Sequence, residues 1–150
     1  MVTSVHLFVG AAIGKAVGNV YITIPVAMIS HYLLDAIPHY NPKPVKSFRE
    51  TGLGGANKKD LILKALEPLI GVSLLSFLIY LNNSPTPVMV IGGFFGWLPD
   101  LLTFLEWKYG INCCPILVRF EKTVHRHAPF VTGILSQAII LLLATIYILM

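Results

Sequence analysis

The amino-acid sequence predicts an all-α membrane protein, and three observations lead to that fold class. Hydrophobic residues make up 55% of the 150 residues and charged residues only 12%, whereas soluble domains carry about 25% charged residues. The mean hydropathy is +0.75. Several apolar runs are long enough to form helices that cross a ~30 Å hydrocarbon core. A chain of this length is expected to form one integral membrane domain, residues 1–150.

Five apolar segments are expected to form a helix bundle. The first, Leu7–Val17, is short, and Gly10, Gly14 and Gly18 follow one another at four-residue spacing, which is typical of a face where another helix packs closely. This segment is too short to cross a membrane alone, so it forms either a tight hairpin with the second segment or a re-entrant element. The other segments are Tyr21–Ile37, Leu61–Leu81, Val88–Trp107 and Phe130–Met150.

Lys and Arg residues gather in two of the four connections between these segments. They lie in 40–60 and 108–126, whereas the connections at 18–20 and 82–85 have none. Because positively charged loops remain in the cytoplasm, we expect an inner-membrane protein with its N-terminus inside and its C-terminus outside. The net charge of +4 is explained by this orientation. No basic stretch is interleaved with aromatic residues, so no nucleic-acid partner is expected.

Cys113 and Cys114 are the only cysteines, and they are adjacent. Adjacent cysteines do not form an ordinary structural disulfide, because the Cα atoms of a bridged pair stand well apart. The absence of a C-x-x-C pair removes zinc-finger and thioredoxin-like interpretations. Free thiols that face the cytoplasm are therefore expected.

Ionisable residues within the apolar segments fall at one end of the predicted bundle. Charged side chains are costly at membrane depth and usually mark a site or a pathway. With the orientation given above, the residues at the cytoplasmic end are His6, His31, His39, His125, His127, Asp35, Glu67, Asp100 and Glu106. The sequence thus predicts one polar site near the inner membrane surface.

His31 and Asp35 are four residues apart and therefore share one helix face. Such a pair suits two ligands of one metal ion, or a carboxylate that orients a metal-binding histidine. A polar pair that satisfies only itself is the alternative. Pro38 is expected to end the helix before His39, so His39 need not share that face. Imidazole combined with carboxylate favours a divalent zinc ion, with manganese or iron as alternatives, over calcium.

Four short motifs resemble those of the small membrane-bound metal-dependent hydrolases. Some members of this family are described as LexA-binding inner-membrane hydrolases, and they are distantly similar to zinc-dependent phospholipases C. Ser30–Asp35 with Pro38 is close to the family motif S-H-x-L-x-D-x-x-x-P. His6 resembles its N-terminal histidine, Leu98–Asp100 its L-P-D-x-D-H motif, and His125–Arg126 the start of its H-R-G-x-T-H motif.

The resemblance and the topology together give the expected activity, hydrolysis of a phosphoester such as a lipid at the cytoplasmic interface. The expected metal ligands are His6, His31, Asp35, Asp100 and His125, with His39, His127 and Arg126 as additional candidates. Asp100 is expected to be a bridging or terminal carboxylate ligand. Glu67 is the expected general base, because it is the only acid deep in its segment and no ligand motif includes it. Arg126 is expected to hold an anionic head group.

The sequence departs from the family motifs at several points, and His125–Arg126 is followed by His127 with no Thr-His pair downstream. Leu102 stands where the second acid of the L-P-D motif belongs, and the S-H motif precedes L-P-D instead of following it. A non-catalytic metal-binding or assembly protein, or a metal or proton carrier, is therefore the alternative. A carrier needs polar residues toward the outer helix ends, and those ends offer only Asn19, Thr23, Asn82, Asn83 and Thr145. The oligomeric state is left open.

Overall fold

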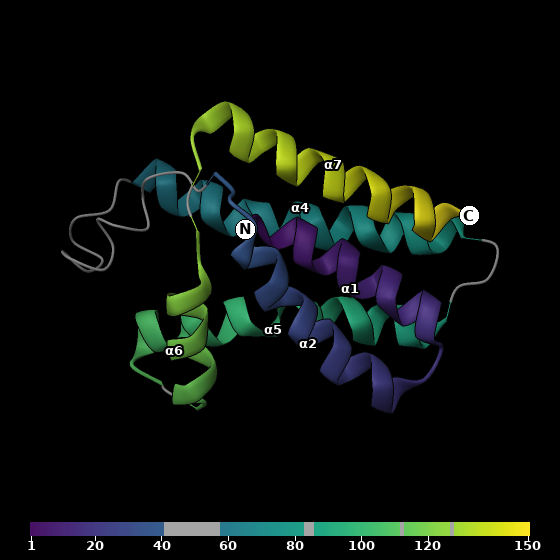
Figure 1. The fold of residues 1–150 in the computed structure, drawn as a ribbon, viewed down its shortest axis with the longest axis horizontal. Helices are drawn as coiled ribbons and strands as arrows, with labels where there is room; N and C mark the ends of the chain where they lie inside the picture. Colours follow the sequence, from purple (N-terminus) through teal and green to yellow (C-terminus); the bar gives the residue numbers. More distant parts are fainter. Residues whose placement is uncertain (41–57, 83–85, 112, 127) are drawn as a thin grey trace.

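The computed structural model describes residues 1–40, 58–82, 86–111, 113–126 and 128–150, and the regular elements in these ranges are six α-helices (Figure 1). Five long helices run along the same axis, and a short one lies across one end of them. The helices are α1 (Thr3–Val17), α2 (Val20–Ala36), α4 (Lys58–Leu81), α5 (Pro87–Tyr109), α6 (Pro115–Val124) and α7 (Phe130–Leu149). The all-α fold class is thereby confirmed for the described part of the chain.

Each of the five predicted apolar segments forms a long helix, whereas α6 occupies a segment that the sequence analysis treats as a loop. Pro115 lies in the first turn of α6, where its fixed φ favours a helix and its missing N–H costs nothing. Along α6, Val118 and Glu121 are buried while Ile116 and Phe120 are exposed. This short amphipathic helix is stabilised by its packing against α2 and α5.

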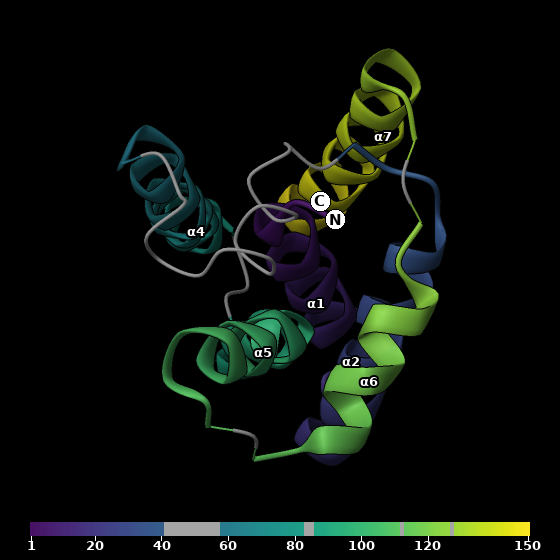
Figure 2. The same cartoon turned by 90° about the vertical axis from the view of Figure 1, so that its left-hand side faces the viewer.

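The central element of the bundle is α1, the shortest of the five long helices. It contacts α2, α4, α5 and α7, and the end-on view in Figure 2 shows it between them. Leu7, Phe8 and Ala11 of α1 form the core with buried residues of the surrounding helices. The small size of α1 is therefore explained by its place inside the bundle.

A tight hairpin joins α1 to α2, as one of the two alternatives predicted. Gly18 has a φ of 66°, and its N–H donates to the carbonyl oxygen of Gly14; only glycine adopts this left-handed conformation easily. Gly18 therefore ends α1 and does not pack against another helix as its spacing suggested. The side chain of Asn19 then accepts a hydrogen bond from the N–H of Tyr21 at the start of α2.

The glycines of α1 and α5 bring these two helices into direct backbone contact. A Cβ atom on Gly10 would lie 2.2 Å from the carbonyl oxygen of Gly92. A Cβ on Gly14 would lie 2.3 Å from the carbonyl oxygen of Val88, and one on Gly96 would lie 2.6 Å from that of His6. This close approach sets the position of His6 relative to α5.

Two helices are long and apolar enough to cross a membrane, judged by length and composition. They are Pro87–Glu106 of α5 and Phe130–Leu149 of α7, with mean hydropathies of 1.7 and 2.1. Only 28% and 22% of these segments are buried inside the structure, whereas the core helix of a soluble protein is mostly buried. Within the described residues, α1, α2 and the apolar part of α4, Leu66–Leu81, are shorter.

Candidate metal centre

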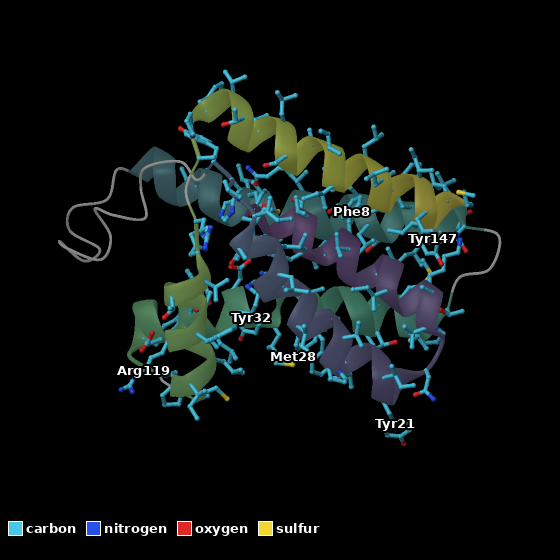
Figure 3. All side chains as sticks on the ribbon, viewed as in Figure 1. Phe8, Tyr21, Met28, Tyr32, Arg119 and Tyr147 are labelled. Carbon is cyan, nitrogen blue, oxygen red and sulfur yellow. The ribbon has the colours of Figure 1, made fainter. Side chains whose placement is uncertain are left out.

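Four helices bring histidine and carboxylate side chains together at one end of the bundle. His6 comes from the start of α1, His31 and Asp35 from the end of α2, and Asp100 from α5. The cluster is completed by His39, which follows α2, by Glu121 of α6 and by His125, which follows α6. Figure 3 shows side-chain nitrogen atoms gathered where α1, α2 and the chain after α6 meet. The α1–α2 turn and the C-terminus lie at the opposite end (Figure 1).

The ligand atoms of these seven residues form three groups that could hold a metal ion. The groups are His6, His31 and Asp100; Asp35, His39 and His125; and His31, Asp35 and Glu121. Within each group, one ligand atom per residue lies within 4.8 Å of the others. All five metal ligands expected from the sequence belong to these groups, so the structure brings them together.

Asp35 lies at the centre of the cluster, and its side chain is fully buried. Its Oδ1 is 3.3 Å from Nε2 of His6, and its Oδ2 is 3.5 Å from Nε2 of His31. The same Oδ2 is 3.2 Å from Nδ1 of His125. The amino group of Met1 also donates to Oδ1. The shared helix face of His31 and Asp35, expected from their spacing, is therefore realised as a contact.

Two of the histidines have the tautomer that a metal ligand needs. Nδ1 of His31 is 2.9 Å from the carbonyl oxygen of Gly96, and Nδ1 of His39 is 2.8 Å from that of Ile37. A carbonyl oxygen only accepts, so each Nδ1 carries the hydrogen and each Nε2 presents a lone pair. A backbone carbonyl that fixes the second ring nitrogen is the usual partner of a metal-binding histidine.

One of the three groups consists of residues with unpaired buried atoms. Both ring nitrogens of His6, Nε2 of His31 and Oδ2 of Asp100 are buried and make no hydrogen bond. A buried polar atom without a partner costs about 1–3 kcal/mol and is rare in native proteins. A divalent cation between these three side chains would take one ligand atom from each of them, so the residues fit a metal ion.

The distances between ligand atoms also agree with a metal site. Nε2 of His39 lies 3.1 Å from Nε2 of His125, and the contacts of Asp35 with His6, His31 and His125 are 3.2–3.5 Å. Two ligands of a tetrahedral zinc ion with metal–ligand bonds of about 2.0–2.1 Å are separated by roughly 3.3 Å. These pairs of atoms are thus close enough to bind one divalent ion. Carboxylate and imidazole ligands are compatible with manganese and iron as well.

The backbone explains why His39 joins the site although α2 ends at Ala36. The N–H of His39 donates to the carbonyl oxygen of Arg126 at 3.3 Å, and its carbonyl oxygen accepts from the N–H of Ala128 at 2.9 Å. The N–H of Arg126 donates to the carbonyl oxygen of Asp35 at 3.1 Å. These three bonds fix the chain after α6 alongside the chain after α2. Pro38 ends the helix as expected, and this pairing then returns His39 to the cluster.

His39 is also held in the form that binds a cation. Its side chain is buried, and burial lowers the pKa of the imidazole to about 4, with the positive amino group of Met1 lowering it further. The imidazole is therefore neutral at pH 7, as a metal ligand must be.

Glu121 is the functional candidate that the sequence analysis did not select. It is buried, and its carboxylate accepts a hydrogen bond from the hydroxyl of Thr103 on α5. Burial raises the pKa of the Glu121 carboxyl to about 8, and the nearby carboxylate of Asp100 contributes. One signal could have identified it, because Glu121 precedes His125 by four residues, the same spacing as in the His31–Asp35 pair.

The remaining predicted site residues lie around the cluster or outside the described residues. Oε1 of Glu67 accepts hydrogen bonds from the N–H and the hydroxyl of Ser4, both at 2.9 Å. Glu67 therefore stabilises the free N-terminal end of α1, and it belongs to none of the three groups. Arg126 is exposed next to the cluster, and His127 lies outside the described residues.

Comparison of this chain with protein-family models, with curated protein sequences and with solved structures gives no match. The resemblance to the membrane-bound hydrolases rests on the motif residues alone. The functional assignment therefore depends on the geometry of the metal centre.

Proposed function

We propose that this protein is a membrane-embedded, metal-dependent hydrolase that cleaves a phosphoester of a membrane lipid at the cytoplasmic surface of the inner membrane. The observation that carries the proposal is the set of buried, unpaired ligand atoms of His6, His31 and Asp100. Within the described residues these atoms make no hydrogen bond, and a divalent cation would bind one atom of each side chain. Five helices that span the membrane, with the N-terminus inside, are part of the same proposal.

The arrangement of the groups supports two ions. His6, His31 and Asp100 form one group and Asp35, His39 and His125 another, with no residue in common. Asp35 lies within 3.5 Å of His6 and His31, so its carboxylate can link the two groups. Two divalent ions held by these residues would supply positive charge for a phosphoester displacement and would lower the pKa of a bound water.

The side chains of this chain have distinct roles in the proposed reaction. His31 and His39 are fixed by backbone carbonyls, so they hold their ligand atoms in place without reorganisation. Arg126 is exposed beside the cluster and supplies a positive charge for an anionic head group. Glu67 remains the predicted general base, and Glu121 is the second candidate because it reaches the ligand cluster.

A carrier is the less favoured alternative because the bundle beyond the metal centre is apolar. The core of α1 continues from His6 through Leu7, Phe8 and Ala11, which pack against Met89 and Ile148. A transport path would need polar side chains along this direction. A metal-binding protein without catalytic activity has the same ligand set, and only an activity assay separates it from a hydrolase.

The test measures bound metal and turnover on the same purified, lipid-reconstituted protein. We expect stoichiometric zinc or manganese and hydrolysis of phosphoester substrates, lipid in preference to soluble, that disappears on chelation. Asp100→Ala and His31→Ala should each lose metal and turnover. Glu106→Gln is the matched control, because it removes a charge from the same helix as Asp100 at a residue outside the three groups.

Two results would contradict the proposal in different ways. A protein that binds no divalent metal would remove the metal centre and with it the hydrolase. Stoichiometric metal without turnover of any phosphoester would instead favour the non-catalytic metal-binding protein.

A further inference from the structure

The short helix α6 has three faces with different chemistry. Val118 and Glu121 point inward, and both are buried. Ile116 and Phe120, four residues apart, form an apolar face and are 80% and 50% exposed. Arg119 is exposed on α6, and Figure 3 shows it pointing away from the bundle. A helix with one face on protein, one apolar face and one cationic position is typical of a helix that lies at a membrane surface.

The orientation of α6 agrees with that environment. Figures 1 and 2 both show α6 crosswise to the long helices, at the end that holds the metal centre. If α5 and α7 cross the membrane, a crosswise helix at their end lies parallel to the membrane plane. Phe120 packs against Tyr32 of α2, with ring centroids 5.0 Å apart, and the same helix exposes Ile29 and Leu33. The apolar face of α6 is thus fixed beside a long helix that is also apolar on its outside.

We propose that α6 is an interfacial element that binds the head-group region of an anionic lipid membrane. Ile116 and Phe120 enter the outer part of the acyl chains, and Arg119 contacts lipid phosphate. Apolar burial and attraction to anionic lipid both contribute to such binding. This inference rests on the membrane location that is part of the proposed function.

The consequence is that the membrane covers the metal centre on the side of α6. Glu121 on the inward face belongs to the ligand cluster, and His125 follows the helix directly. A helix held in the head-group region would therefore place these ligands at the depth of a lipid phosphoester. The lipid surface is in this way both the partner of α6 and the source of the substrate.

The experiment measures how deep each face of α6 lies in a lipid bilayer. In the full chain, Cys113→Ser and Cys114→Ser remove the two free thiols, and single cysteines are introduced as Ile116→Cys, Phe120→Cys or Leu142→Cys. Each variant is labelled with a fluorophore and reconstituted in vesicles of phosphatidylcholine and phosphatidylglycerol. Quenching by nitroxides near the lipid head groups is compared with quenching by aqueous iodide. Leu142 of α7, which is 60% exposed, reports on a membrane-spanning helix.

We expect the labels at 116 and 120 to be quenched severalfold more by the shallow nitroxide than by iodide. Adding Arg119→Gln should weaken nitroxide quenching at 120 in vesicles with phosphatidylglycerol and leave it unchanged in pure phosphatidylcholine. Stronger quenching by iodide than by the shallow nitroxide at 116 and 120, with the label at 142 protected by lipid, would overturn the interfacial role of α6 alone. Iodide quenching at 142 would instead overturn the membrane location on which the proposed function rests.

Discussion

Gly10→Ala tests whether the close contact between α1 and α5 determines the geometry of the metal centre. The added Cβ would lie 2.2 Å from the carbonyl oxygen of Gly92, whereas ordinary contact begins at 3.4 Å. The two helices must therefore separate locally by about 1.2 Å, the difference between these two distances. The obstacle is a backbone atom, so no side-chain rotation can relieve it.

The expected cost follows from this displacement. Overpacking of this kind destabilises a folded protein by about 1–3 kcal/mol. A loss of about 2 kcal/mol lowers the Tm of a chain of this size by roughly 4–8 °C. His6 lies one helical turn before Gly10, and ligands must be held to within about 0.5 Å. Gly10→Ala should therefore also weaken metal binding.

The assay compares thermal unfolding of the chelator-treated protein and the metal content of the loaded protein, both in the same detergent. Gly71→Ala is the matched control, because its Cβ would first meet the side-chain Oγ of Ser4 at 2.8 Å and would lie 3.3 Å from the nearest backbone atom, Cα of Ser4. We expect a smaller loss of Tm and normal metal content in the control. If Gly10→Ala were no less stable than Gly71→Ala and bound metal normally, the backbone contact would not position His6.

Three further predictions concern the site and the orientation. Asp35→Asn should fold but lose metal, because the amide keeps the shape of the side chain without its charge. If elemental analysis showed unchanged metal occupancy, Asp35 would only orient the ligands. Glu121 has a pKa of about 8 in the folded protein against an ordinary 4.5, so the folded state binds the carboxyl proton more tightly than the unfolded state does. The unfolding free energy of the metal-free protein should therefore fall as the pH rises from about 4.5 to about 8. Glu121→Gln, which cannot ionise, should flatten that fall in thermal melts, and an unchanged slope would refute the assignment. Cys113 and Cys114, both free, should escape an impermeant maleimide on intact cells and react after permeabilisation, whereas reaction from outside would invert the proposed orientation.

The sequence by itself predicted the five long helices, although not α6, and the end of the bundle at which the polar residues gather. Long apolar runs leave few alternatives to helices, because every backbone polar group in lipid needs an internal partner. The four-residue spacing of His31 and Asp35 fixed their shared face, because this relation is local to one helix. The glycines at 10 and 14 likewise indicated close helix packing, although the sequence did not show which helices pair.

Only the tertiary structure decided how the complete ligand cluster is assembled. His39 lies beyond the end of α2, and backbone hydrogen bonds with the chain around Arg126 hold it near Asp35. The paired segments are more than 80 residues apart in the sequence, so no local pattern predicts their contact. Glu121 was hidden because its amphipathic helix is only ten residues long, and such a short helix needs its packing against α2 and α5 to be stable. The unpaired atoms of His6, His31 and Asp100 come from three helices. Their relation to one metal ion exists only once α1 has been enclosed by its neighbours.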